Sequence, residues 1–118
     1  MDEASLRPYR EYHARREREL REEREALRLR VLEQAREAIR RVAPEFPAIR
    51  AVYLFGSIVQ PGRFHSGSDL DVAIDCEDIG AETPFARALE ELLDRSVDLR
   101  PRVGPIAQAV GDEGERVV

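Results

Sequence analysis

Hydrophobic and polar positions divide the chain into a helical first third and a mixed remainder. Residues 9–42 contain no Gly or Pro and consist mainly of Arg, Glu, Leu and Ala, which favour helix. We expect one long helix here, preceded by a loose start over residues 1–8 that ends at Pro8. The part from 12 to 24 is almost wholly charged, and an apolar stripe begins at Leu27, so the second half of the helix should pack on a sheet. The stripe comprises Leu27, Val31, Leu32, Ala35, Ala38, Ile39 and Val42.

After the helix, apolar runs alternate with chain-breaking residues, which indicates short strands and helices. Residues 51–55 form an apolar run typical of a buried strand, which we expect to span 49–55, and Gly56-Ser57 breaks this run. A loop rich in Gly, Pro and Ser leads to residues 70–75, where apolar and acidic residues alternate as in a half-buried strand. The later expected elements are a helix over 84–93 with Thr83 as its cap, a strand over 96–99, a short helix over 106–110 and a last short strand over 115–118.

This order of elements predicts a mixed α/β (α+β) fold with one small central sheet flanked by helices. We expect two parts, a long charged N-terminal helix over residues 1–43 and a globular domain over residues 44–118. The helix either binds a partner protein or is a solvated appendage, and its sequence leaves both open.

Two carboxylates follow the loop at the start of the second strand. Asp69 and Asp71 are two residues apart, so their side chains share one face of the strand and can bind the same cation or two neighbouring cations. Paired aspartates are oxygen ligands suited to Mg²⁺. Gly56 and Ser57 offer backbone N–H groups and a hydroxyl to phosphate oxygens, and glycine permits close approach. The combination suggests metal-assisted transfer of a nucleotidyl or phosphoryl group.

At these residues the sequence resembles the DNA polymerase β-like nucleotidyltransferases. The resemblance is strongest to the minimal nucleotidyltransferase (MNT) group, small proteins often encoded beside a HEPN-type ribonuclease toxin, and it covers roughly residues 49–118. The matching segments are Gly56-Ser57, Gly62-Arg63 and Ser68-Asp69-Leu70-Asp71. That family uses a third acidic residue on a later strand, and Asp98 in Val97-Asp98-Leu99 matches this pattern.

The resemblance implies a nucleotidyltransferase fold and a set of residue roles. Asp69, Asp71 and Asp98 would be catalytic and would bind two Mg²⁺ ions, with ATP as the substrate. The nucleotide-binding residues would be Gly56, Ser57, Arg63 and Ser68. The acceptor would be the hydroxyl of a tyrosine on a HEPN toxin, so that the protein would act as an antitoxin. The alternatives are a nucleotidyltransferase acting on a small molecule and a non-catalytic module that binds nucleotide or toxin.

Charge and composition narrow these expectations. The net charge is −5, and all 19 basic residues are Arg. Residues 44–118 contain 7 Arg and 14 acidic residues, which argues against strong binding to nucleic acid.

Cys76 is the only cysteine, and we expect it to be structural in a reducing cytoplasm. No apolar run is long enough for a membrane span, and homo- or hetero-oligomerisation stays open. Asp75 is expected to be solvent-exposed, and His65 to be a loop residue.

Overall fold

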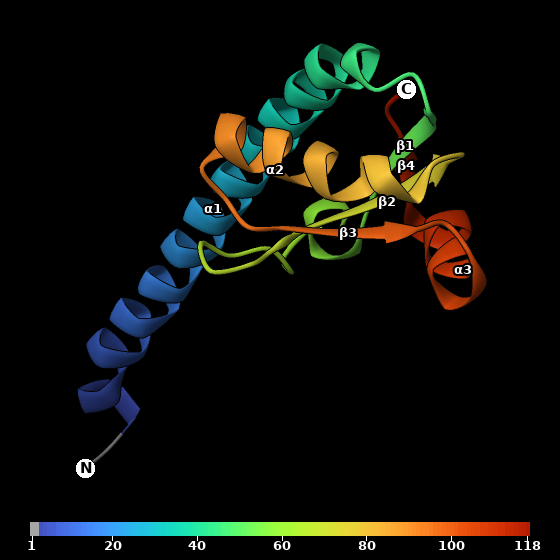
Figure 1. Ribbon diagram of the computed structural model, residues 1–118. Helices are drawn as coiled ribbons and strands as arrows, with labels where there is room; N and C mark the ends of the chain where they lie inside the picture. The colour runs from blue at the N-terminus through green and yellow to red at the C-terminus, as the bar shows by residue number, and fades with distance from the viewer. Residues whose placement is uncertain (1–2) are drawn as a thin grey trace.

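A four-stranded mixed sheet lies at the centre of the protein, in a computed structural model that describes the backbone of residues 3–118 and the side chains of residues 6–118 (Figure 1). The strand order is β3-β2-β1-β4. β1 pairs antiparallel with both β2 and β4, whereas β2 and β3 are parallel, which confirms the expected mixed sheet. The strands are β1 (Ile49–Phe55), β2 (Leu70–Cys76), β3 (Val97–Pro101) and β4 (Glu115–Arg116).

Helices cover both faces of the sheet. They are α1 (Glu3–Val42), α2 (Glu82–Leu93) and α3 (Gly104–Glu113). On one face, the apolar stripe of α1 and Phe85 and Leu89 of α2 form the main core with Val52, Leu54 and Val72 of the sheet. On the other face, a smaller cluster joins Phe55, Ala73 and Val110 of α3. Because side chains alternate along β2, Asp71 and Asp75 lie on the same face as Ala73, the face that α3 covers.

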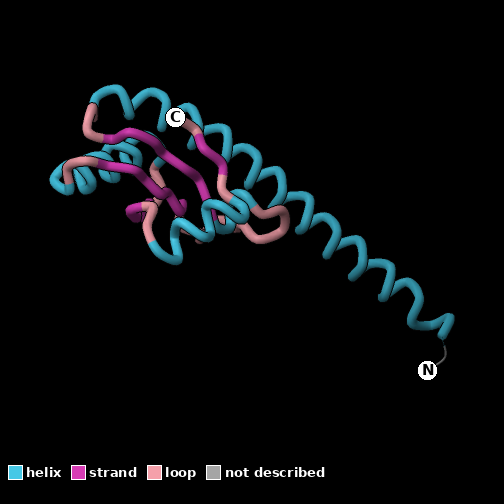
Figure 2. Tube along the Cα trace, turned by 90° about the vertical axis from the view of Figure 1, so that its right-hand side faces the viewer, coloured by secondary structure: helices cyan, strands magenta, loops and turns pink. Residues whose placement is uncertain are grey.

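The N-terminal half of α1 extends beyond the sheet, as the charge pattern predicts (Figures 1 and 2). Side chains over residues 7–18 are exposed to solvent, whereas Val31, Ala35 and Ile39 are buried against the sheet and α2. Of the described residues, no helix is both long and apolar enough to cross a membrane.

The start of α1 differs from the expected one. The helix includes Pro8 and begins at Glu3, so the loose segment expected over residues 1–8 is wrong for its described part. Proline at this position removes only one backbone hydrogen bond near the helix start. The long run of helix-favouring residues after Pro8 stabilises the helix C-terminal to the proline.

Two further element boundaries differ for local reasons. Thr83 does not cap α2, because α2 begins at Glu82, directly after a short 3₁₀ turn (η3, Ile79–Ala81). The capping side chain is that of Asp78, which caps η3 by accepting a hydrogen bond from the Gly80 N–H (2.9 Å). α3 passes through Gly111 and ends before Gly114. A single glycine costs a helix only about 1 kcal/mol, which is too little to end it.

Candidate nucleotide-transfer site

The parallel pairing of β2 with β3 brings two of the expected aspartates together. Asp71 and Asp98 are direct partners in the register of the two strands, and Asp69 lies two residues before Asp71. Asp71 and Asp98 are partly buried, whereas Asp69 is exposed. The sheet therefore places the three carboxylates at one end of the face that α3 partly covers.

The turn after β1 lies against the carboxylate of Asp71. Gly56 begins a 3₁₀ turn (η2, Gly56–Val59) and has a φ of +73°, a conformation that other residues rarely adopt. A Cβ atom at Gly56 would lie 2.2 Å from Oδ2 of Asp71, so only glycine allows this approach. Ser57 is the next residue of the turn, and its carbonyl accepts a hydrogen bond from the Gln60 N–H (3.1 Å). The close packing places the Gly56-Ser57 backbone beside the carboxylate of Asp71.

The loop between the turn and β2 contains the other expected nucleotide-binding residues. Arg63 is exposed. The Ser68 hydroxyl accepts a hydrogen bond from the His65 N–H (3.0 Å), and His65 Nδ1 accepts one from the Gly67 N–H (3.1 Å). Both side chains thus stabilise the loop itself, as expected for His65.

Arginines that the sequence did not single out hold this loop and one of the aspartates. Nη1 of Arg95 donates to the carbonyls of Ser66 (3.2 Å) and Ser68 (2.8 Å), and its guanidinium lies 4.9 Å from the ring centre of Phe64. Arg95 therefore fixes the segment that leads into Asp69. On β3, Nε of Arg100 donates to Oδ1 of Asp98 (2.9 Å).

Electrostatics separate Asp71 from Asp75 on the same strand. Burial raises the pKa of Asp71, and the negative charges of Asp98 and Asp69 raise it further against the opposing effect of Arg100. The hydrogen bonds that Arg102 donates lower the pKa of Asp75, and the Tyr53 hydroxyl adds to this effect. Asp75 is partly buried, and Arg102 donates to both of its oxygens at 2.9 Å, so the expectation that Asp75 is solvent-exposed is wrong. Its partners come from the residues after β3 and from β1, which the local sequence pattern does not show.

The donor set suits a divalent cation. Asp98 and Asp69 lie close enough to Asp71 for their negative charges to add to the effect of burial on its pKa, and carboxylate oxygens are suitable ligands for Mg²⁺. Within the described residues, no three His, Cys, Asp or Glu side chains are already arranged around one metal position. Asp98 pairs with Arg100 in this structure, so it would have to exchange this partner to ligate a metal.

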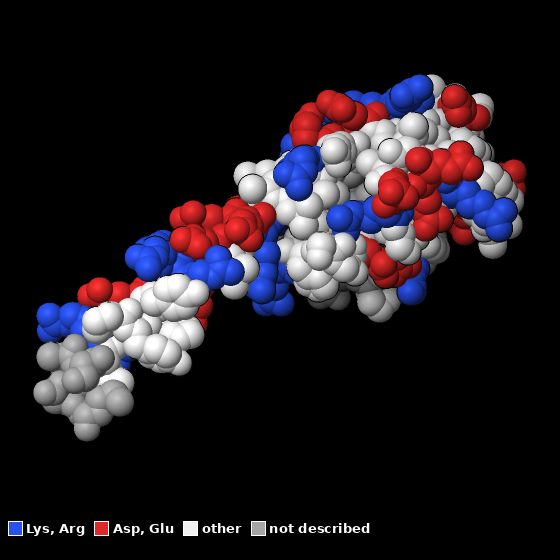
Figure 3. All heavy atoms as spheres, turned by 90° about the vertical axis from the view of Figure 1, so that its left-hand side faces the viewer, with Lys and Arg blue, Asp and Glu red and all other residues white. Residues whose placement is uncertain are grey.

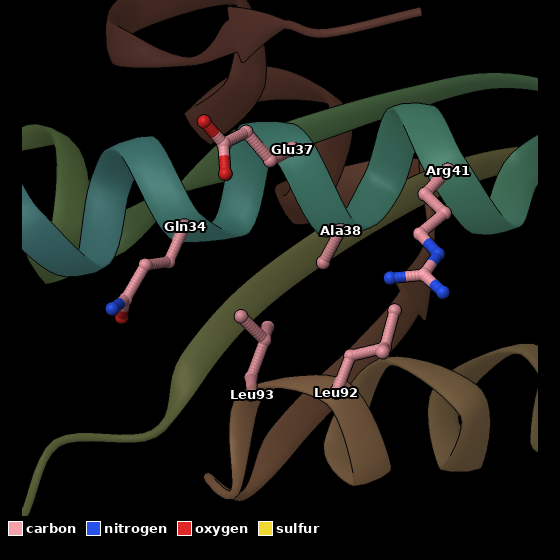
Figure 4. A pocket seen from close by; sticks show the side chains of 6 residues that line it. All are labelled: Gln34, Glu37, Ala38, Arg41, Leu92 and Leu93. Atoms are coloured by element: carbon pink, nitrogen blue, oxygen red, sulfur yellow. The ribbon is translucent and has the colours of Figure 1, made fainter.

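A pocket between α1 and α2 lies on the opposite face of the sheet (Figure 4). Leu92 and Leu93 of α2 point toward α1, which contributes Ala38 and Arg41 to a space of about 300 Å³. α1 and α2 cover one face of the sheet, and the side chain of Asp71 lies on the other face, so this pocket is separate from the carboxylates.

The chain is similar to known proteins in sequence and in fold. The family model described as "Polymerase beta, Nucleotidyltransferase" matches residues 37–103. No curated protein matches the chain by sequence. Among solved structures, the chain is similar to one described as a toxin-antitoxin with AMP-PNP, with 31% identity over 70% of this chain and 72% of that chain and a TM-score of 0.59.

Two further solved structures are similar to the chain. One is described as a mutant of the toxin-antitoxin MntA-HpeT, with 29% identity, a TM-score of 0.58, and coverage of 71% of this chain and 72% of that chain. The other is described as a tri-AMPylated Shewanella oneidensis HEPN toxin in complex with an MNT antitoxin. Its identity is 26% and its TM-score 0.53, over 74% of this chain and 71% of that chain.

Proposed function

The chain belongs to the polymerase β family of nucleotidyltransferases, and we propose that it transfers AMP from ATP to a hydroxyl of a partner HEPN-type toxin. The observation that carries the proposal is the packing of the Gly56 turn against Asp71, which has Asp98 beside it. A phosphate-binding turn and carboxylates at one place are what nucleotidyl transfer requires. The similarity to MNT antitoxins in complexes with HEPN toxins, one of them AMPylated, supports the choice of partner and reaction.

The candidate residues have different parts in the proposed reaction, and that of Ser68 is to order the loop before Asp69. Gly56 and Ser57 hold the β- and γ-phosphates of ATP, and Arg63 balances charge on the departing pyrophosphate. Asp69, Asp71 and Asp98 would hold Mg²⁺, which when bound offsets phosphate charge and lowers the pKa of the acceptor hydroxyl.

The transfer itself exchanges one bond for another. The acceptor oxygen forms a bond to the α-phosphorus while the bond from that phosphorus to the bridging oxygen of the β-phosphate breaks. Pyrophosphate leaves, and the hydroxyl proton passes to water. The product on the toxin is a tyrosyl-AMP ester, whose added negative charge would repel RNA phosphates.

Ser57→Ala is expected to weaken ATP binding by about 1–3 kcal/mol, the range for a hydrogen bond to a charged group. Binding of AMP should change less, because Ser57 is assigned to the β- and γ-phosphates. Isothermal titration of both nucleotides measures the difference. Equal losses for ATP and AMP would place Ser57 elsewhere in the site.

The projecting part of α1 is the surface that we propose for toxin docking. Tyr9 and Tyr12 are 65% and 51% exposed, and both rings contact His13, so the three side chains form an exposed aromatic cluster on this segment. On the face shown in Figure 3, Arg and acidic side chains are interspersed along this segment, so it presents no continuous basic surface for nucleic acid. We therefore propose that the helix over residues 1–43 serves partner binding and the domain over residues 44–118 serves transfer. The C-terminal half of α1 also packs in the core of that domain.

Removing residues 1–24 should preserve the fold and slow toxin modification, because the apolar stripe from Leu27 remains while the exposed aromatic residues are lost. A shorter deletion of residues 1–8 keeps Tyr9 and Tyr12 and serves as the control. Circular dichroism checks folding, and a time course of toxin modification gives the rate. Full-rate modification by the longer deletion would show that this segment is a solvated appendage.

Intact-mass spectrometry of the toxin tests the function. Toxin incubated with this protein, ATP and Mg²⁺ should gain one or more AMP units, and peptide mapping should place them on a tyrosine. If the toxin is inhibited without gaining AMP, inhibition is by contact alone and the proposed reaction is wrong.

A further inference from the structure

Arg28 is the one buried charged side chain among the described residues, with 7% of its surface exposed. It lies on α1 just after the charged half of the helix. Its Nη1 donates to the carbonyl oxygen of Ile58 (2.9 Å), and its Nε donates to both carboxylate oxygens of Glu25 (3.0 Å each). Arg28 therefore connects α1 to a backbone carbonyl 30 residues away.

The carbonyl that Arg28 contacts belongs to the turn at the candidate site. Ile58 follows Ser57 in the four-residue turn η2, and its own side chain is fully buried in the core. Gly56, the first residue of the same turn, packs against the carboxylate of Asp71. The turn thus lies between Asp71 and Arg28, and a shift at either contact would move the groups of Gly56 and Ser57 that the proposed function assigns to phosphate.

We propose that Arg28, oriented by Glu25, is a positioning residue that holds the phosphate-binding turn beside Asp71. The inference rests on the proposed function, because that function assigns the turn to the triphosphate of ATP. Arginine suits this task because its planar guanidinium can donate to a carboxylate and a carbonyl at the same time. Lysine has a single ammonium group and cannot reproduce both contacts in the same geometry. The helix α1 then acts as part of the nucleotide site as well as part of the core.

A second ion pair on the same helix provides a matched control. Arg36 lies about two turns further along α1 and donates from Nε and Nη2 to the two oxygens of Glu115, which belongs to β4. This pair also ties α1 to the rest of the fold. The hydrogen bonds of Arg36 reach Glu33 on α1 and Glu115 on the edge strand β4, whereas those of Arg28 reach the turn η2. Loss of Arg36 should therefore reduce stability without moving the turn.

Nucleotide binding by wild-type protein, Arg28→Met, Arg28→Lys and Arg36→Met tests the inference. ATP and AMP are titrated separately in the presence of Mg²⁺ and without toxin, at a temperature where circular dichroism shows every variant to be folded. Arg28→Met should weaken ATP binding about 10-fold and AMP binding less, the size expected for losing one charged hydrogen bond that orders the turn. Arg28→Lys should recover part of this loss, and Arg36→Met should bind ATP within about twofold of wild type.

Equal weakening of ATP binding in the Arg28 and Arg36 variants would overturn the inference, because both pairs would then act only through stability. If Arg28→Met does not fold, Glu25→Gln gives the same information, since it loosens Arg28 while leaving its contact with Ile58 in reach. Wild-type affinity in both Glu25→Gln and Arg28→Lys would also contradict the inference. A wild-type protein that binds ATP no better than AMP would instead contradict the proposed function, and the inference with it.

Discussion

Asp71→Asn should abolish nucleotide transfer and at the same time raise the melting temperature of the metal-free protein. The substitution keeps the shape of the side chain but removes a charge that a divalent cation requires. Losing such a ligand costs several kcal/mol of transition-state stabilisation, which corresponds to a rate loss on the order of 100-fold or more. The measurement is the rate of AMP addition to the toxin at saturating ATP.

The expected gain in stability follows from the raised pKa of Asp71. The pKa of Asp71 is higher in the folded protein than in the unfolded chain. The free energy of unfolding therefore falls as the pH rises from the ordinary aspartate pKa to the higher value of the folded state, and it stays lower above that pH. At neutral pH the charged side chain therefore destabilises the metal-free protein, and asparagine removes this cost. Thermal unfolding at pH 7 with a chelator measures the effect.

Asp75→Asn is the matched control on the same strand and the same face. The pKa of Asp75 is lowered by Arg102, so its contribution to stability is present above the ordinary aspartate pKa and is lost as pH falls through the folded value. Asparagine at this position should lower the melting temperature at pH 7 while leaving transfer close to the wild-type rate. An Asp71→Asn protein with wild-type transfer activity would refute the assigned role of this carboxylate.

Gly56→Ala should impair both folding stability and transfer. A methyl group at this position would lie 2.2 Å from Oδ2 of Asp71, so the turn or the carboxylate has to move. The φ of +73° adds about 1–2 kcal/mol of backbone strain for a residue with a Cβ atom. We expect a lower melting temperature and a loss of transfer on the order of 100-fold, because the displaced groups are those that meet the phosphates and the cation.

Gly62→Ala separates strain from displacement. Gly62 has a similar φ of +81°, but nothing lies within 4 Å of the position that its Cβ would occupy. This variant should lose stability from backbone strain alone and keep most of its activity. The account would be contradicted if Gly56→Ala and Gly62→Ala retained the same transfer rate.

The strand and turn pattern of the site could be predicted from the sequence because it is local. Alternation over residues 70–75 shows which aspartates share a face, and the break at Gly56-Ser57 marks the end of a buried strand. The place of Asp98 beside Asp71 required the parallel pairing of β2 with β3. Residue chemistry alone does not give that pairing, and the family resemblance suggested it.

The arginines that support the site could not be found this way. Arg28 and Arg95 donate to backbone carbonyls 30 and 27 residues away. Because every residue has a backbone carbonyl, the sequence does not show which carbonyl an arginine will contact. The partner of Asp75 is hidden for a related reason, because Arg102 reaches it from the end of a neighbouring strand. Long-range polar contacts of this kind depend on the finished fold.

Transfer of labelled phosphate to the toxin distinguishes nucleotidyl transfer from phosphoryl transfer and from inhibition by contact. Parallel reactions contain ATP labelled at the α- or at the γ-phosphate, with toxin, Mg²⁺ and either wild-type protein or Asp71→Asn. Nucleotidyl transfer predicts that the toxin gains label only from α-labelled ATP and only with the wild-type protein. Label from γ-labelled ATP would indicate phosphoryl transfer, and an inhibited toxin without any label would contradict the enzymatic account.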